Sequence, residues 1–307
     1  MTLSVVIPAF NEEEVLEESY RRIVSVLDGE KIEYELIFVN DGSRDKTLEI
    51  LNKMSEKDTH VKVIDFSRNF GHQVAISAGM DNSSGDAVVI IDADLQDPPE
   101  VIPEMLKKWR EGYEVVYGRR KKRDGETIFK KVTAKMFYRF MSSLSNSDMP
   151  LDTGDFRLID RKVCDAMRNL NEHNRYVRGL IGWMGFKQTG VEFDRAARFA
   201  GETKYSLKHM LRLAGNGIFS FSAKPLKLPL LLSILMLFAA LGIIICKFIF
   251  SVPFIGSLGV IFTNLIIGAC ICLAIGIIGE YISRITDEVR GRPYYIISNK
   301  INFKEEE

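Results

Sequence analysis

Two carboxylates stand one residue apart directly after an apolar run, in the stretch IIDADLQDPPE of residues 90–100. Asp92 and Asp94 form the pair, and the amide of Gln96 follows two residues later. Such oxygen ligands suit Mg²⁺ or Mn²⁺, which usually complete their coordination with substrate phosphates. We therefore expect a divalent metal, Mg²⁺ or Mn²⁺, held by Asp92, Asp94 and Gln96. A polar turn is the alternative for an isolated pair of this kind, so the surrounding elements must decide.

A strand is the element that has to position this pair. Residues 86–91 form a short β-branched run after Gly85, which is typical of a strand in the middle of a parallel sheet. Ligands of open α/β sheets bind beyond the carboxyl ends of the strands, where both carboxylates would lie. Asp97 is predicted to cap a following helix that has Pro98 as its first residue.

Further strands are predicted at residues 3–8, 33–40, 61–66 and 113–118, with helical segments between them, and a later strand is expected to end at Asp194. This alternation indicates an α/β fold with a mostly parallel sheet. Glu12 and Asp41 follow the first two strands and would lie at the same edge as Asp92, although capping or turn formation is an alternative role for them. No Gly-x-Gly-x-x-Gly follows the first strand, which argues against a dinucleotide oxidoreductase.

Basic residues follow the strand at 113–118 in the run RRKKR, residues 119–123. Arginines at a ligand-binding edge can bind a phosphate or diphosphate through two parallel hydrogen bonds. We expect Arg120 and Arg123 to do so, and we interpret Lys121 and Lys122 as solvated. His72 follows the strand at 61–66 and is interpreted as orienting its loop, because no serine or cysteine nucleophile accompanies it.

The chain has 307 residues with 41 basic and 41 acidic side chains, but residues 228–282 carry only Lys247 and Glu280. The apolar stretches 228–250 and 254–282 each exceed the roughly 20 residues that span a bilayer, so we expect two transmembrane helices joined by a short hairpin. A buried hairpin in a soluble domain is the alternative. Basic residues flank both outer ends, which predicts cytoplasmic ends. No N-terminal signal peptide is expected, because Met1 leads directly into a strand.

Two amphipathic basic helices are expected at residues 129–144 and 205–227. The second would lie at the membrane interface before the first span, whereas the first could pack on the sheet or lie on the membrane. The four cysteines show neither a disulfide framework nor zinc spacing.

In order and spacing, the segments VVIPAFNEE (residues 5–13), FVNDGS (38–43), DADLQ (92–96), GDFR (154–157) and RFAGETK (198–204) resemble the family 2 glycosyltransferases of GT-A fold. Within that family they are most similar to polyprenyl-phosphate glycosyltransferases, the group of bactoprenol glucosyltransferase and dolichol-phosphate mannose synthase. The resemblance extends from about residue 3 to the C-terminus. Thr203 stands where relatives more often have serine, and it keeps the hydroxyl.

The resemblance implies a Rossmann-like GT-A domain with a C-terminal transmembrane hairpin, and it implies roles for individual residues. Asp155 matches the proposed catalytic base. Arg123 is expected at the acceptor phosphate. The expected nucleotide-sugar contacts are Pro8, Ala9, Glu12, Asp41, Asp92, Ala93, Asp94, Arg120, Arg198 and Lys204.

The expected organisation is a catalytic domain at residues 1–204, a juxtamembrane helix at 205–227, two spans at 228–283 and a cytoplasmic tail at 284–307. The expected reaction is inverting transfer of one sugar, from UDP-glucose or UDP-GlcNAc, to undecaprenyl (polyprenyl) phosphate at the cytoplasmic face of the cell inner (plasma) membrane. No nucleic-acid partner is expected, and homo-oligomerisation is left open.

Two alternatives remain. A processive polysaccharide synthase is disfavoured by the two spans and by the absence of a Gln-x-x-Arg-Trp motif. A catalytically silent membrane scaffold is disfavoured by the intact acidic motif.

Overall fold

The structure is a computed structural model that describes residues 1–120, 153–170, 172, 175–194, 226, 229, 231–236, 238–239 and 257–303. The chain forms two compact units. One contains the sheet and includes the residues from Pro293 onward, and the other contains the long helix α10 (Ser257–Arg290).

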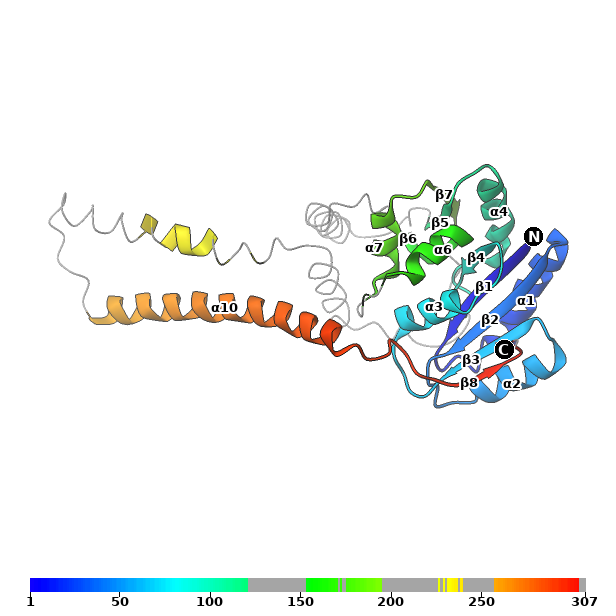
Figure 1. Cartoon of the computed structure of the whole chain (residues 1–307), viewed down its shortest axis with the longest axis horizontal. Coiled ribbons are helices and arrows are strands. Elements are labelled where there is room, and N and C mark those ends of the chain that lie inside the picture. The colour runs from blue at the N-terminus through cyan, green and yellow to red at the C-terminus, as the bar shows by residue number, and fades with distance from the viewer. Residues whose placement is uncertain are drawn as a thin grey trace. The chain divides into compact units, whose positions relative to one another are not determined.

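An eight-stranded sheet is the centre of the first unit, with the strand order β7-β5-β6-β4-β1-β2-β3-β8 (Figure 1). Only β6 and β8 run antiparallel to the other strands. The strands are β1 (Thr2–Ala9), β2 (Glu33–Asn40), β3 (Val61–Phe66), β4 (Ala87–Ile90), β5 (Val115–Arg120), β6 (Thr153–Asp160), β7 (Gln188–Phe193) and β8 (Ile297–Ile301). This confirms the expected mostly parallel α/β sheet.

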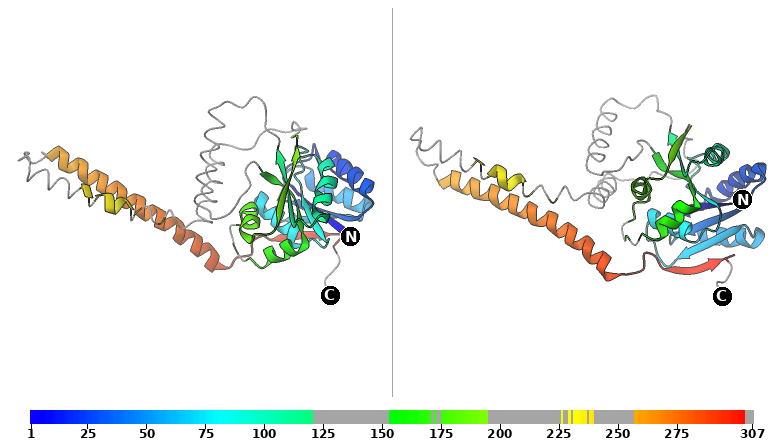
Figure 2. Two further views of the ribbon diagram at one scale, coloured as in Figure 1. Left: turned by 90° about the horizontal axis from the view of Figure 1, so that it is seen from above. Right: turned by 45° about the horizontal axis from the view of Figure 1, so that its top comes forward.

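Helices cover both faces of the sheet (Figure 2). They are α1 (Leu16–Glu30), α2 (Thr47–Lys57), α3 (His72–Asp81), α4 (Ile102–Arg110), α6 (Arg161–Arg168) and α7 (Val177–Met184). The side chains of β1 alternate between the faces. Leu3, Val5 and Ile7 join a core with α1, α2 and α4, whereas Val6 faces α3, whose Gly79 leaves no room for a β-carbon. Burial on both faces explains why β1 is an almost continuous apolar run.

The start of α4 differs from the prediction. A 3₁₀ turn at Pro99–Val101 precedes α4, which begins at Ile102. The prediction that Asp97 caps a helix beginning at Pro98 is therefore wrong. The buried Asp97 carboxylate instead faces Arg120, with 3.7 Å between Oδ1 and the guanidinium.

The segment expected as a cytoplasmic tail, residues 284–307, contains the end of a helix and a strand. Helix α10 continues to Arg290, and the chain then forms β8, which pairs with β3. Most of β8 is solvent-exposed, so its sequence ISNKI lacks the apolar run by which the buried strands were found.

Helix α10 contains the one segment of the described chain, Ile266–Arg290, that is long and apolar enough to cross a membrane by length and composition. It overlaps the second predicted span. Most of the first predicted span, the helix at 129–144 and nearly all of the helix at 205–227 lie outside the described residues. The two-span arrangement stays a prediction.

Candidate active site

The carboxyl edge of the sheet brings together carboxylates from two strands that are far apart in sequence. Antiparallel pairing of β4 with β6 sets Ile90 opposite Arg157. Asp92 follows Ile90 by two residues and Asp155 precedes Arg157 by two, so this register brings the two carboxylates close together. The two acidic motifs of the sequence therefore meet at the edge where α/β sheets bind ligands.

His72, the first residue of α3, lies between these two carboxylates. Its Nε2 is 3.5 Å from Asp92 Oδ1 and 3.3 Å from Asp155 Oδ2. Burial lowers the pKa of His72, but the two carboxylates outweigh this and raise the pKa to about 9. A raised pKa favours the cationic imidazole, which argues against a general-base role for His72. This places His72 inside the acidic cluster, beyond the loop-orienting role inferred from its sequence.

Asp155 is held by side chains from α3 and α7. Gln73 Nε2 donates to Asp155 Oδ2 at 3.1 Å, and Gln73 Oε1 accepts a hydrogen bond from the Val177 backbone N–H at 3.1 Å. Arg178 Nε lies 3.0 Å from Asp155 Oδ1. Burial raises the pKa of Asp155, but Arg178 and His72 more than offset it and hold this pKa well below its usual range. Asp155 is therefore a firmly ionised carboxylate.

Arg157 is a buried cation behind this cluster. Its guanidinium donates to the backbone carbonyls of Gly154 at 2.8 Å and Asp155 at 3.3 Å. Burial lowers the pKa of Arg157 to about 10, so it remains charged. These bonds hold the first residues of β6 in the conformation that presents Asp155.

The rest of the acidic motif forms a tight turn after β4. Leu95 has a positive φ of 58°, and the Gln96 backbone N–H donates to Asp94 Oδ1 at 3.0 Å.

On β5, Arg120 lies beside Gly154, where an added β-carbon would sit 2.9 Å from the guanidinium. Glycine at 154 thus lets Arg120 approach the start of β6.

The acidic cluster fits a divalent metal that shares its coordination with a substrate. In the described structure, Asp92 Oδ1 is buried without a hydrogen-bond donor, and burial raises the pKa of this carboxyl. The described residues contain no group of three or more His, Cys, Asp or Glu side chains arranged as a metal cage. An ion held by two carboxylates and completed by phosphates is the arrangement typical of Mg²⁺. Asp92 and Asp94 are the residues that fit this role.

A polar cavity of about 540 Å³ lies at the carboxyl ends of β2 and β3. Gly42, at φ 66°, allows the turn after β2 to touch the backbone of Arg68 and Asn69 after β3. The lining residues are Phe10, Asn11, Asn40, Gly42, Ser43, Arg44, Leu48, Asp65, Phe66, Ser67, Arg68, Asn69 and Ser298.

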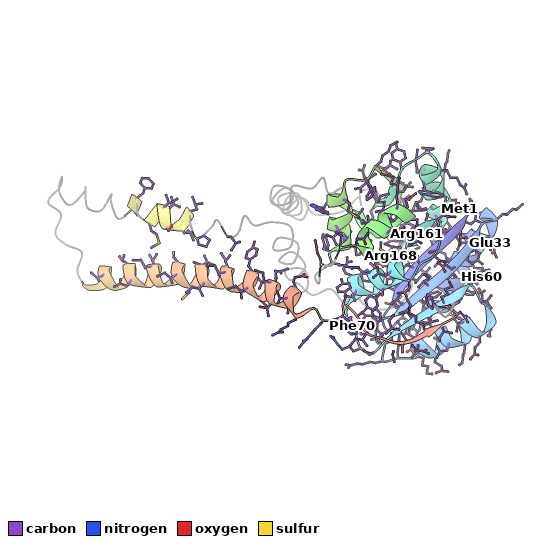
Figure 3. All side chains as sticks on the ribbon, in the orientation of Figure 1. Met1, Glu33, His60, Phe70, Arg161 and Arg168 are labelled. Atoms are coloured by element: carbon purple, nitrogen blue, oxygen red, sulfur yellow. The ribbon has the colours of Figure 1, made fainter. Side chains whose placement is uncertain are left out.

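The four predicted nucleotide contacts of the first two strands do not line this cavity. Pro8 and Ala9 are buried at the end of β1. The Glu12 backbone N–H donates to Thr47 Oγ1 at 2.9 Å. Asp41 is buried and accepts from the backbone N–H groups of Phe70 at 2.6 Å and Gly71 at 3.0 Å, so it shapes the loop after β3. Phe70 of that loop is labelled in Figure 3.

The structure thus gathers Asp92, Ala93, Asp94, Gln96, Arg120 and Asp155 at one edge, whereas Arg123, Arg198 and Lys204 lie outside the described residues. Gln73, Arg157 and Arg178 received no role from the sequence. Gln73 follows a loop after a predicted strand, and that position at the ligand-binding edge is a signal that could have drawn attention to it. Nothing in the sequence pairs Arg178 with Asp155, because the two meet only through tertiary folding.

Comparison with known proteins assigns the chain to a family. The model of the glycosyl transferase family 2 matches residues 4–168, more than half of the chain. The chain belongs to this family. It is a glycosyltransferase. Relatives of nearly the same length bear glycosyltransferase names as well.

An uncharacterized glycosyltransferase, YkcC, from Bacillus subtilis is 55% identical over 96% of this chain and 92% of the relative. The SfII prophage-derived bactoprenol glucosyl transferase of Shigella flexneri is 38% identical over 97% of each chain. Among solved structures, glucosyl-3-phosphoglycerate synthase from Mycobacterium tuberculosis, in complex with Mn²⁺, UDP and glucosyl-3-phosphoglycerate, has a TM-score of 0.50. It is 21% identical over 71% of this chain and 77% of that one, which shows a shared fold.

Proposed function

We propose that this protein transfers one sugar, with inversion, from a UDP-sugar to a polyprenyl phosphate, with UDP-glucose or UDP-GlcNAc as donor and undecaprenyl phosphate as acceptor. The observation that carries the proposal is the meeting of Asp92 and Asp155 at the carboxyl edge of the sheet, in a chain that also has a helix apolar enough to span a membrane. Bactoprenol glucosyl transferases that are 38% identical over nearly the whole chain support a lipid phosphate acceptor.

The donor would lie over the turn after β4, with its diphosphate toward Asp92 and Asp94. Their carboxylates, with the amide of Gln96, would hold Mg²⁺ or Mn²⁺, which when bound neutralises charge on the departing nucleoside diphosphate. Arg120 extends from β5 to the same edge and would contact the diphosphate. The polar cavity after β2 and β3 is large enough to take the nucleoside part of the donor.

Asp155 would position the reactants in this scheme. A carboxylate with a pKa well below the usual range is a weak base. A phosphate monoester has a second pKa of about 6, so the acceptor is already ionised near neutral pH and needs little help from a base. The cations around Asp155 keep it charged, and the acceptor oxygen would attack the sugar carbon directly, opposite the leaving diphosphate.

Purified full-length protein, assayed with labelled nucleotide sugars and undecaprenyl phosphate, would test the proposal. We expect one sugar per lipid, in a linkage labile to mild acid, formed only with a divalent metal. UDP-glucose, UDP-GlcNAc and a GDP-sugar would be compared as donors. Activity with the GDP-sugar alone would contradict the uridine assignment and leave the acceptor assignment intact.

The same assay separates the alternatives. Extended sugar chains would favour a processive synthase over single transfer. Absence of transfer with every donor, in protein that is folded and binds nucleotide, would favour a catalytically silent scaffold. The intact acidic cluster argues against the scaffold.

A further inference from the structure

The polar cavity after β2 and β3 has one lining residue that comes from the far end of the chain. Among the described residues that line it, all but Ser298 belong to the first 69 residues. Ser298 lies on β8, the red strand beside β3 in Figure 1, and it belongs to the same compact unit as the rest of the cavity. The lining of the cavity is therefore complete only when the C-terminal strand has joined the sheet.

Ser298 is the extra residue of a β-bulge in the pairing of β8 with β3. Phe66 lies opposite Ile297 and the preceding residue, Asp65, lies opposite Asn299, so the register leaves Ser298 with no opposite residue on β3. Bulges re-aim a side chain and are frequent at sheet edges and next to active sites. Phe66 and Asp65 also line the cavity, and Ser298 is solvent-exposed, so a ligand in the cavity can reach it.

Contacts just before the bulge hold this part of the chain against the loop after β3. The Ser67 backbone N–H donates to the Ile296 carbonyl at 3.1 Å. The Tyr295 ring stacks on Phe66, with 5.3 Å between the ring centroids. Ser67 and Phe66 are themselves lining residues of the cavity. The chain around Ser298 is thus fixed to the same loop that forms the cavity.

Protection of the sheet edge is another use for a bulge at this place. β8 lies at the edge of the described sheet, and bulges hinder edge strands from pairing with a second chain. That role requires the irregular backbone but does not require the bulged residue to line a cavity. The position of Ser298 in the cavity lining therefore favours a role in ligand binding.

We propose that Ser298 is a donor-binding residue, whose hydroxyl contacts the nucleoside part of the nucleotide sugar. The inference rests on the proposed function, in which this cavity takes the nucleoside. A serine hydroxyl both donates and accepts hydrogen bonds, so it can pair with a ribose hydroxyl or with a polar group of the base. A residue that follows the apolar helix in the chain then takes part in substrate recognition.

Ser298→Ala and Ser298→Phe test this contact. Loss of the hydroxyl should weaken the binding of UDP to the purified full-length protein about 2- to 10-fold, the range expected for one hydrogen bond. The phenylalanine ring would occupy space in the cavity and should weaken UDP binding further. In the transfer assay, both variants should raise KM for the nucleotide sugar and leave kcat unchanged, because the contact is the same in the ground state and the transition state.

Asn299→Ala and Asn299→Phe are the matched controls. Asn299 is the next residue of β8 and is equally solvent-exposed, but it is not a lining residue of the cavity. These variants should bind UDP like the wild type, and melting temperatures would show that all four variants are folded. An equal loss of UDP affinity at both positions would mean that the strand matters and the Ser298 side chain does not, which would overturn the proposal.

Two further outcomes would also overturn it. Unchanged UDP affinity in both Ser298 variants would leave protection of the sheet edge as the role of the bulge. A wild type that binds neither UDP nor GDP would remove the ligand from the cavity. The proposed function can fail separately: if the wild type binds UDP, loses affinity in the Ser298 variants and transfers no sugar to lipid, the transfer reaction is refuted and the Ser298 contact stands.

Discussion

The carboxylate of Asp155 depends on its neighbours for its charge and its orientation. Gln73 and His72 of α3 approach one oxygen, and Arg178 of α7 approaches the other. Three groups that donate to or neutralise a buried acid favour its ionised form. A single substitution among Gln73, His72 and Arg178 should therefore alter the charge or orientation of the Asp155 carboxylate and leave the fold intact.

Asp94→Asn should lower kcat by roughly three orders of magnitude, since it removes a ligand charge at the leaving group. The asparagine is nearly isosteric, and its side-chain oxygen can still accept from the Gln96 N–H. The measurement is steady-state transfer at several Mn²⁺ concentrations, with Asp86→Asn, an exposed acid before β4, as the control. Near-normal turnover of the Asp94 variant, or full wild-type turnover in chelator, would contradict the metal assignment.

Arg178→Gln should move the acid limb of the kcat profile to higher pH. Arg178 lowers the pKa of Asp155, so removing the cation raises that pKa, and the carboxylate becomes protonated at a pH where the wild type is still ionised. The check is kcat from about pH 4 to 8. Arg21→Gln, on the exposed face of α1, should leave the profile unchanged. An unshifted acid limb in the Arg178 variant would mean that Asp155 does not control it.

The local pattern after a strand drew attention to Asp92 and Asp94, and the family resemblance drew attention to Asp155; the structure places Asp92 and Asp155 close to the same histidine. Asp41 has a structural role that its motif did not indicate, since its carboxylate accepts hydrogen bonds from backbone N–H groups of the loop after β3. Gln73 and Arg178 could not be paired with Asp155 from the sequence. They are 82 and 23 positions away from it, and only the packing of α3 and α7 brings them together.

At the scale of elements, the buried parallel strands were the easiest to predict. β2 and β3 have the predicted bounds, because apolar runs mark strands that are covered on both faces. β6 and β8 were missed for different reasons. β6 contains charged residues at the end that lies in the candidate active site. β8 is a mostly exposed edge strand that pairs only with β3 in the described sheet.

Glu35→Gln should destabilise the sheet in a pH-dependent way. Burial raises the pKa of Glu35, but bonds from Lys62, Ser4 and Ser84 more than offset this and lower it. A lowered folded-state pKa stabilises the protein above the unfolded value of about 4.3, and that stability is lost as the pH falls through the folded value. The variant should therefore melt roughly 2–10 °C lower at pH 7, and the difference should shrink below about pH 4.

Thermal melts at pH 7 and pH 3 check this prediction. Glu49→Gln is the control, because Glu49 pairs with Lys53 on the exposed surface of α2 and should matter little for stability. A melting difference between Glu35→Gln and the wild type that is the same at both pH values would contradict the assigned role of the Glu35 charge.

At the scale of the whole molecule, the membrane prediction rests on the basic residues that lie on both sides of the two apolar stretches. Lys224 and Lys227 precede the first apolar stretch, Arg284 and Arg290 follow the second, and the predicted hairpin offers only Lys247. By the positive-inside rule both flanks should be cytoplasmic, which would place the sheet unit where nucleotide sugars are made.

Cysteine labelling of intact cells tests this orientation. In a variant without the four native cysteines, Ser251→Cys should react with an impermeant maleimide from outside, whereas Glu56→Cys, exposed on α2, should react only after lysis. Labelling of Glu56→Cys in intact cells would reverse the orientation. Protection of both positions would indicate that residue 251 does not reach the outer surface.

The pairing of β8 with β3 also constrains how the protein is made. β3 is complete after residue 66, but its partner β8 ends at Ile301, beyond both apolar stretches. During translation this edge of β3 therefore stays unpaired until both apolar stretches and β8 have left the ribosome, and an unpaired edge is a site of aggregation. Premature termination near residue 290 would leave that edge open permanently, so quality control could recognise such truncated chains by it.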